Sequence, residues 1–261
     1  MFQRANAEPA ENENAPPDAM TEARQAVAFE PPEVESREVL ASLTNSTCFG
    51  HHLAARAWSL GFAAAQRKAF VADGLAANWG IWERDFKRWK FVPILDFIHA
   101  LTYVYAGAMA GRSKEEGGPV YLRWITWVWQ GQVCKVISEV AARGEGAPPE
   151  GWSGPPPTDA GETDPRQIIA GTLTYLANQQ SRMNYPEYRR QGLPITSSHI
   201  ESTVKQINQH VNGSEKFWTA EGGEALLQLR ADQLSDTQPM SLHWIRRSRN
   251  ATGTRTYTKA A

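Results

Sequence analysis

AFVADGLAANWGIWERDFKRWKFVPILD, residues 69–96, is the stretch that decides the fold. Its first apolar run stops on Asp73-Gly74, its last run stops on Asp96, and tryptophans recur at helical spacing between them. This order predicts two short buried strands joined by a helix, a β-α-β unit with parallel strands and a right-handed crossover. Residues just past the carboxyl ends of such strands face the crevice where ligands bind, so Asp73 and Asp96 are candidate site residues.

Helical periodicity surrounds this unit on both sides. Before it, we expect two helices between Glu35 and Gly61, with Thr47 as the N-cap of the second. After it, we expect helices over residues 97–111, 120–143, 166–180, 199–211 and 220–234. The apolar stripe of the second of these consists of Leu122, Ile125, Trp129, Val133, Val136 and Val140. We interpret the tryptophans at 124, 127 and 129 as core, with a platform for stacking bases as the alternative.

Composition indicates a globular chain whose first 33 residues are a disordered leader or a loosely attached linker. Apolar residues make up 41% of the 261 positions and ten are tryptophan, enough for a sizeable core, and we expect no transmembrane segment and no signal peptide. Residues 1–40 carry nine acids against three arginines, so the leader is acidic and the body mildly basic. Cys48 and Cys134 are isolated, which argues against a zinc site or a disulfide framework and favours a cytoplasmic protein.

Four residues are candidates for chemistry, and each has a structural alternative. Asp73-Gly74 is also typical of an ordinary turn, and Asp96 of the N-cap of the following helix. His99 lies on an apolar helix face, where most histidines are half-buried and satisfied. Glu201 forms a capping box with Ser198 at the start of a helix.

The arrangement of the acidic residues favours a metal-dependent reaction on DNA. A carboxylate at a strand end and a second one on a later helix can hold divalent metal against a phosphodiester. Two Mg²⁺ ions about 3.5–4 Å apart would activate the attacking oxygen and stabilise the leaving one, and Mg²⁺ or Mn²⁺ requires oxygen ligands.

Three blocks resemble the DDE transposases of bacterial insertion sequences, specifically the ISKra-type group. The first is Val71-Ala72-Asp73-Gly74 with the tryptophans that follow, and the second is Ile94-Leu95-Asp96-Phe97-Ile98-His99-Ala100, similar to a D-x-x-H signature. The third, the most specific, runs from Tyr175 to Arg230 and includes Gly192-Leu193-Pro194-Ile195 and Glu201-Ser202. The likeness covers most of residues 35–235.

The resemblance implies an α/β fold, a partial RNase H-like (retroviral-integrase-like) core with a large, mainly helical insertion. Asp73 and Glu201 would be the second and third catalytic, metal-binding carboxylates, and Asp96 and His99 an accessory pair. Residues 35–99 would begin the core, 100–190 would be the insertion with a Pro-rich loop at 144–165, and 191–236 would complete the core. A disordered leader, 1–34, and a basic tail, 237–261, would flank them.

The chain departs from the family pattern in two places. Thr196-Ser197-Ser198 replaces the usual Gly-Ser-Gly before the glutamate, so the close backbone approach that glycine allows is partly lost. The first catalytic aspartate is expected upstream of this chain, since Asp18 lacks a strand pattern. We therefore expect a truncated or split-frame transposase fragment that is inactive alone.

The expected partners are the DNA ends of an insertion sequence and an N-terminal transposase fragment, with oligomerisation possible and no membrane. Arg246, Arg247 and Arg249 lie in a stretch of 22 residues with five positive charges and no acids, which indicates phosphate contact or a solvated tail. The alternative function is a non-catalytic helical interaction protein in which Glu201 merely caps a helix.

Overall fold

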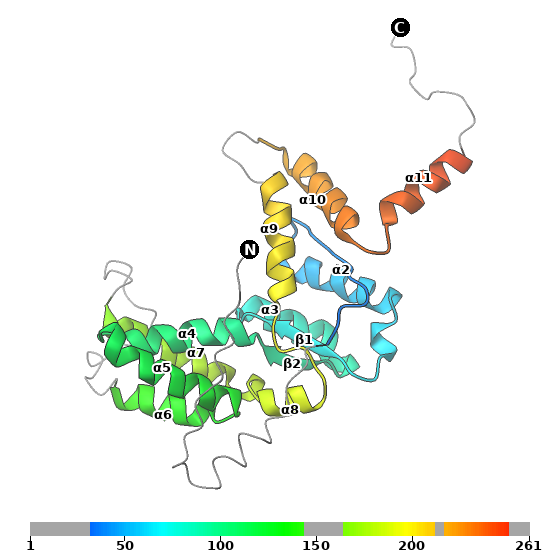
Figure 1. Cartoon of the computed structure of the whole chain (residues 1–261). Helices are drawn as coiled ribbons and strands as arrows, with labels where there is room; N and C mark the ends of the chain where they lie inside the picture. The colour runs from blue at the N-terminus through cyan, green and yellow to red at the C-terminus, as the bar shows by residue number, and fades with distance from the viewer. Residues whose placement is uncertain (1–31, 144–163, 212–216, 251–261) are drawn as a thin grey trace, which may run out of the picture. The chain divides into compact units, whose positions relative to one another are not determined.

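The computed structural model describes residues 32–143, 164–211 and 217–250 (Figure 1). The predicted leader up to residue 31, the Pro-rich loop at 144–163 and the last tail residues, 251–261, lie outside the described residues. Within these ranges the chain is mostly helical and contains a two-stranded sheet. The α/β class is confirmed at this level.

The predicted β-α-β unit is present. Strands β1 (Ala69–Ala72) and β2 (Val92–Leu95) pair in parallel, in a register that sets Ala69 opposite Val92 and Ala72 opposite Leu95. The crossover consists of α3 (Ala76–Ile81), a π-helical turn η2 (Trp82–Phe86) and a 3₁₀ turn η3 (Lys87–Trp89). The two strands therefore end at the same edge of the sheet.

An aromatic core holds the crossover against α2 (Ser46–Ser59), which is followed by the short turn η1 (Phe62–Ala64). Ala54, Ile81, Phe86 and Phe91 are buried there. The rings of Phe86 and Phe91 meet edge to face, with centroids 5.1 Å apart. This geometry adds to the hydrophobic stabilisation of the core.

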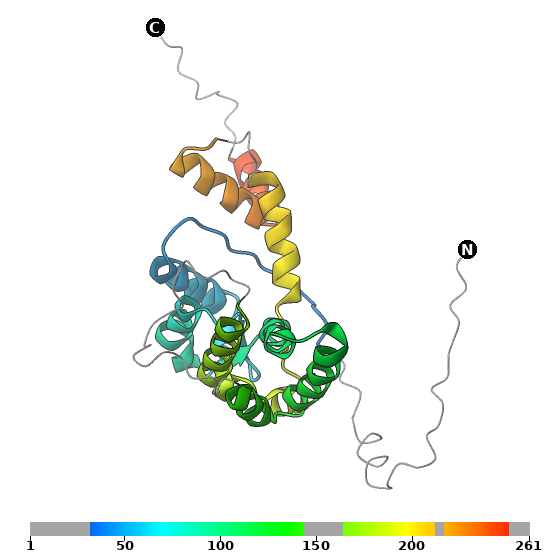
Figure 2. The same ribbon diagram turned by 90° about the vertical axis from the view of Figure 1, so that its left-hand side faces the viewer.

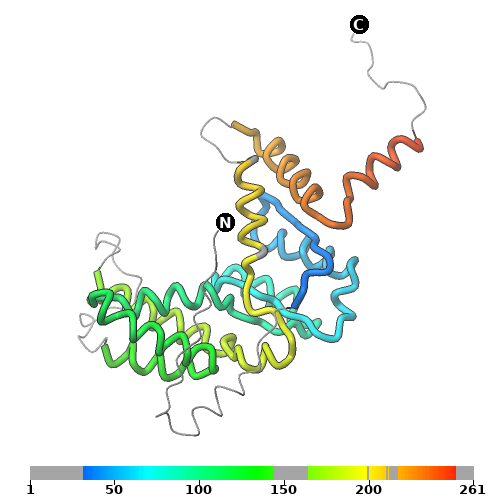
Figure 3. Tube along the Cα trace, in the orientation of Figure 1, coloured from blue at the N-terminus to red at the C-terminus, as the bar shows by residue number. Residues whose placement is uncertain are grey.

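The predicted helix before α2 is wrong, because the segment from residue 36 to 42 is neither helix nor strand. Figure 3 traces it beside α10 (Ala220–Leu234). Its backbone exchanges hydrogen bonds with the end of that helix: Val39 N–H donates to Ser235 Oγ at 3.0 Å, and Asp236 N–H donates to the Arg37 carbonyl at 2.8 Å. Asn45 rather than Thr47 caps α2, accepting from Cys48 N–H.

Four helices pack around a second core: α4 (Phe97–Met109), α5 (Lys114–Trp129), α6 (Val133–Arg143) and α7 (Pro165–Gln179). Figure 2 shows several of them nearly end-on. The predicted single helix over residues 120–143 is two helices, since the chain turns at Gly131 with φ of 74°. Leu122 is exposed, which corrects its place in the apolar stripe, and Trp124 is fully buried while Trp127 and Trp129 are half-buried.

The remaining chain is helical. It forms η4 (Gln180–Arg182), α8 (Tyr185–Arg190), α9 (Ser198–Val211), α10 and α11 (Pro239–Arg249). Helices α9 and α10 agree with the prediction, whereas α8 and α11 were not predicted. None of the helices in the described ranges combines the length and apolar character that a bilayer crossing requires. Both cysteines are free and exposed.

Candidate functional site: the carboxyl edge of the sheet

Asp73 and Asp96 follow the last residues of β1 and β2 and so lie at the same edge of the sheet. The Asp96 N–H donates to the Ala72 carbonyl at 2.8 Å, which extends the pairing by one bond. The next amide, of Phe97, donates to the Ile195 carbonyl at 2.9 Å. This bond brings the segment before α9 to the edge, although it lies about a hundred residues further along the chain.

Asp96 is fully buried, and its carboxylate accepts hydrogen bonds and lies near the imidazole of His99. Its Oδ1 accepts from the His99 N–H at 2.8 Å, so the predicted N-cap of α4 is confirmed. Its Oδ2 accepts from the Ser197 hydroxyl at 2.5 Å and from the Ser197 N–H. Burial raises the pKa of this carboxyl, but the Ser197 and His99 hydrogen bonds outweigh it and hold the pKa below its ordinary value. Asp96 is thus an ionised clasp between α4 and the start of α9.

Asp73 closes the turn after β1, as its structural alternative predicted. Its Oδ1 accepts from the Leu75 N–H at 3.0 Å and from Asn78 Nδ2 at 2.8 Å. Gly74 has φ of 96°, a conformation that side chains with a Cβ rarely adopt. The Asp73 carbonyl accepts from the Tyr175 hydroxyl at 2.8 Å, which ties this turn to α7.

Glu201 lies in the first turn of α9, with its side chain 46% exposed. The predicted capping box requires Ser198 to precede the helix, but α9 begins at Ser198, so Ser197 occupies that position and its carbonyl accepts from the Glu201 N–H at 3.3 Å. Glu201 Oε1 lies 3.9 Å from His99 Nδ1, which in turn lies 3.4 Å from Asp96 Oδ1. Neither of these two contacts has hydrogen-bond geometry. The buried Nδ1 of His99 therefore has no hydrogen-bond partner among the described residues.

The structure therefore brings Asp96, His99 and Glu201 together, from α4 and α9. It records no contact between Asp73 and Glu201 within the described ranges. Tyr175 nevertheless lies within electrostatic range of both aspartates. Burial raises the pKa of its phenol, and charge repulsion from Tyr103, Asp73 and Asp96 raises it further. The two strand-end carboxylates thus share one electrostatic neighbourhood.

The described residues do not form a complete magnesium site. Among them, no three His, Cys, Asp or Glu side chains converge closely enough to hold a metal ion. Both oxygens of Asp96 already accept hydrogen bonds, which leaves this carboxylate poorly suited to ligation. Asp73 and the exposed Glu201 are the two predicted ligands whose accessibility is compatible with a metal.

The predicted nucleic-acid residues lie on α11, within what was expected to be a tail. Arg246, Arg247 and Arg249 occupy its last turns and are exposed. The Arg247 guanidinium lies 5.7 Å from the ring centre of Trp244. Cations at a helix C-terminus also interact favourably with the helix dipole, so their placement has a structural explanation as well.

Sequence reasoning missed Ser197 and Tyr175, which position the two aspartates. Their partners lie about a hundred residues away, and no local pattern reports such a pair.

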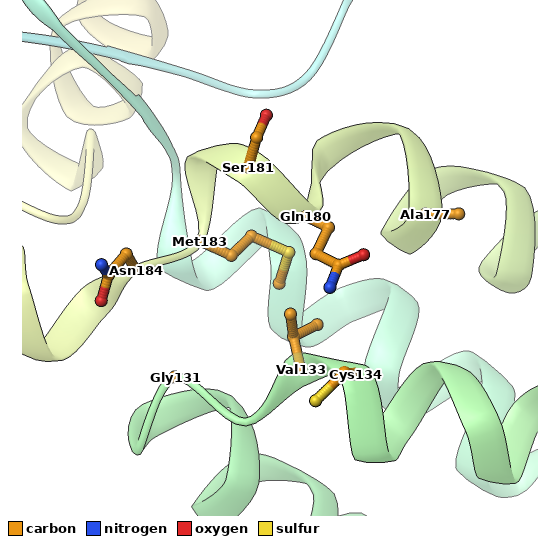
Figure 4. A pocket seen from close by; sticks show the side chains of 8 residues that line it. All are labelled: Gly131, Val133, Cys134, Ala177, Gln180, Ser181, Met183 and Asn184. Carbon is orange, nitrogen blue, oxygen red and sulfur yellow. The ribbon is translucent and has the colours of Figure 1, made fainter.

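A hollow of about 570 Å³, lined by Cys134, Gln180, Met183 and Asn184 among others, lies between α6 and the α7–α8 connection and contains none of the predicted site residues (Figure 4).

Comparison of the chain with protein-family models, with curated proteins and with solved structures gave no match.

Proposed function

We propose that the chain carries part of the RNase H-like core of an insertion-sequence DDE transposase, with Asp73 and Glu201 as the second and third acidic residues. The supporting observation is the convergence of β1, β2 and the start of α9 on one edge, where Ser197 and Asp96 link segments that are far apart in sequence. Acidic residues at a strand end and on a later helix can supply oxygen ligands to the two metal ions that act on a phosphodiester.

In this proposal the residues of the edge have separate roles. Asp73 and Glu201 are the accessible oxygen ligands. Asp96 is a positioning residue, because its buried oxygens hold Ser197 and hence the first turn of α9. Mg²⁺ or Mn²⁺, when bound, would activate the attacking oxygen and stabilise the leaving oxygen. The described residues supply two of the three acidic ligands, so the chain alone should not cleave DNA.

The catalytic proposal is tested by cleavage of labelled DNA in the presence of Mg²⁺. The chain is assayed alone and mixed with an N-terminal transposase fragment that supplies the first aspartate. We expect cleavage only in the mixture, and a loss of at least about a hundredfold in rate, or about 3 kcal/mol, for Asp73→Asn and for Glu201→Gln. Undiminished cleavage in either variant would show that the site is wrongly assigned.

Metal binding is tested separately by calorimetric titration with Mn²⁺. Glu115→Gln is the matched control, because Glu115 is also a glutamate in the first turn of a helix, α5. We expect Glu201→Gln to weaken Mn²⁺ binding and Glu115→Gln to leave it unchanged. Equal affinities for the two variants would remove Glu201 from the ligand set.

A second candidate function, a non-catalytic helical interaction protein, is favoured by one observation. Helix α11 exposes Leu242, Trp244 and Ile245, each about half accessible, next to its arginines. In that case the acids of the edge serve as cap and turn residues, and Mn²⁺ titration should detect no carboxylate-dependent binding. Arg246→Gln and Arg247→Gln would then leave DNA affinity unchanged, whereas phosphate contact predicts weaker binding and a smaller dependence on salt.

A further inference from the structure

A second hollow, of about 540 Å³, lies between α2 and the η2–η3 turns. The aromatic side chains of Trp58 and Trp89 line it, together with Arg88, His51 and Asp85. It contains none of Asp73, Asp96, His99 and Glu201, the residues of the acidic edge of the sheet. The hollow therefore needs an explanation independent of the proposed chemistry.

Trp58 is 62% exposed although it belongs to α2, whose other face is part of the aromatic core. Its ring meets that of Trp89 at a centroid distance of 5.6 Å and an angle of 38°. A tryptophan usually contributes large apolar area to a core or an interface. Here the half-buried Trp89 supports Trp58 from one side and leaves an aromatic surface open to a ligand.

A cation lies beside these rings. The Arg88 guanidinium is 5.0 Å from the ring centre of Trp89, and within the described residues no ion pair is recorded for it. Nearby Arg84 and Lys87, in contrast, pair with Asp85 and Glu83. The segment 46–90, which contains both walls of the hollow, carries seven Lys and Arg against three Asp and Glu.

The wall of the hollow is held in place by a buried carboxylate. Asp85 is 5% exposed and its Oδ2 accepts from Arg84 Nε at 3.1 Å and Nη2 at 2.8 Å, while its Oδ1 lies 3.6 Å from His51 Nε2. A Cβ at Gly50 would lie 2.6 Å from this Oδ2, so the close approach of α2 requires glycine. The π-helical turn that carries Asp85 is a backbone feature that is frequent at functional sites.

We propose that this hollow binds single-stranded DNA, with a base stacked on Trp58 and the adjoining phosphate on Arg88. An open aromatic face next to an available cation matches the two parts of a nucleotide, the π-face of the base and the charge of the phosphate. Such stacking tolerates any sequence, because every base has a π-face. The inference needs no metal and stands whether or not the acidic edge is catalytic.

The test is fluorescence anisotropy of a labelled oligothymidylate of about 12 nucleotides, within the usual site size, titrated with the full chain in EDTA. Trp58→Ala should weaken binding at least about fivefold, the lower end for loss of one stacked base, and Trp58→Phe should retain most of the affinity. Arg88→Gln should lower the slope of log affinity against log salt by about 0.7, as expected for one phosphate contact on a single strand. A duplex of equal length, whose bases are not available for stacking, should be insensitive to Trp58→Ala.

Two control variants keep the test specific. Trp218 is 51% exposed but lies outside the hollow, and Arg190 is an exposed arginine paired with Glu187. Trp218→Ala and Arg190→Gln should bind like the wild type, and circular dichroism verifies the fold of every variant. Photocrosslinking with 5-iodouracil gives a second readout, and adducts should map to the peptides that contain Trp58 or Trp89. The proposal is overturned if the oligonucleotide does not bind, if Trp58→Ala binds like the wild type, or if the adducts lie elsewhere.

Discussion

Replacing Asp96 with alanine should cost far more stability than loss of a helix cap. The cap itself, lost with the bond from the His99 N–H, is worth about 1 kcal/mol. The hydroxyl and amide of Ser197 would also lose a charged acceptor, at about 1.5–3 kcal/mol for such a bond, and no water can easily replace it at a fully buried site. We expect a total loss of about 4 kcal/mol, measured by urea unfolding at pH 7.

Asp164→Ala is the matched control, because Asp164 caps α7 through the Arg166 N–H at 2.9 Å and is only half-buried. It should lose about 1 kcal/mol. If Asp96→Asn is needed because Asp96→Ala is too unstable to fold, this variant, which keeps the shape, should still lose about 2 kcal/mol. Its single amide oxygen cannot accept from the His99 N–H on one side and from Ser197 on the other, as the two carboxylate oxygens do. A loss at Asp96 no larger than at Asp164 would refute the clasp between α4 and α9.

Further predictions concern the same edge. Folding lowers the pKa of Asp96, so the stability contributed by its ionised carboxylate is complete above about pH 4 and is lost as pH falls through the native pKa. The difference in the free energy of unfolding between wild type and Asp96→Asn, measured by urea unfolding at a series of acidic pH values, should therefore shrink as pH falls. Gly74→Ala should destabilise the chain by more than about 1 kcal/mol in thermal unfolding, because φ is 96° and the new Cβ would lie 2.7 Å from the Tyr175 hydroxyl, whereas Gly80→Ala in the open interior of α3 should be neutral or stabilising. Burial raises the pKa of four phenols, those of Tyr121, Tyr175, Tyr185 and Tyr188. Absorbance titration should therefore show their ionisation delayed beyond pH 10 until the chain unfolds, and the free energy of unfolding should fall above that pH. A single ionisation step of all tyrosines near pH 10 would contradict the burial of these four.

The β-α-β unit could be predicted because its signals are local. Two apolar runs end on Asp73 and Asp96, and those aspartates do close a turn and cap a helix. The non-helical segment before α2 could not be predicted in the same way. Val39 and Leu43 have helical spacing, but the backbone there is satisfied by Ser235 and Glu224, nearly two hundred residues away. Long-range partners override local periodicity.

Two of the other fold errors had signals in the sequence. The apolar stripe runs on from α5 into α6, and it concealed the turn at Gly131, although glycine is the residue that such a turn favours. Pro239 at the first helical position and the spacing of Leu242 and Ile245 indicate a helix, yet the arginines of α11 led to its interpretation as a tail. In both cases one strong pattern outweighed a weaker and more local one.

A carboxylate oxygen that accepts structural hydrogen bonds is not available to bind a metal ion. The acidic residues at the edge of the sheet can therefore be ranked as metal ligands by how far their oxygens are already used. Asp96 is buried and its oxygens accept three hydrogen bonds, so ligation there would require the α4–α9 clasp to open. Glu201 is half exposed and its recorded contact is a 3.9 Å approach to His99, so it can turn toward a ligand without such a loss. Substitution at Asp96 should therefore act through stability, and substitution at Glu201 through metal binding. A Glu201→Gln variant that lowers stability as much as Asp96→Asn would reverse that ranking, because it would make Glu201 part of the clasp.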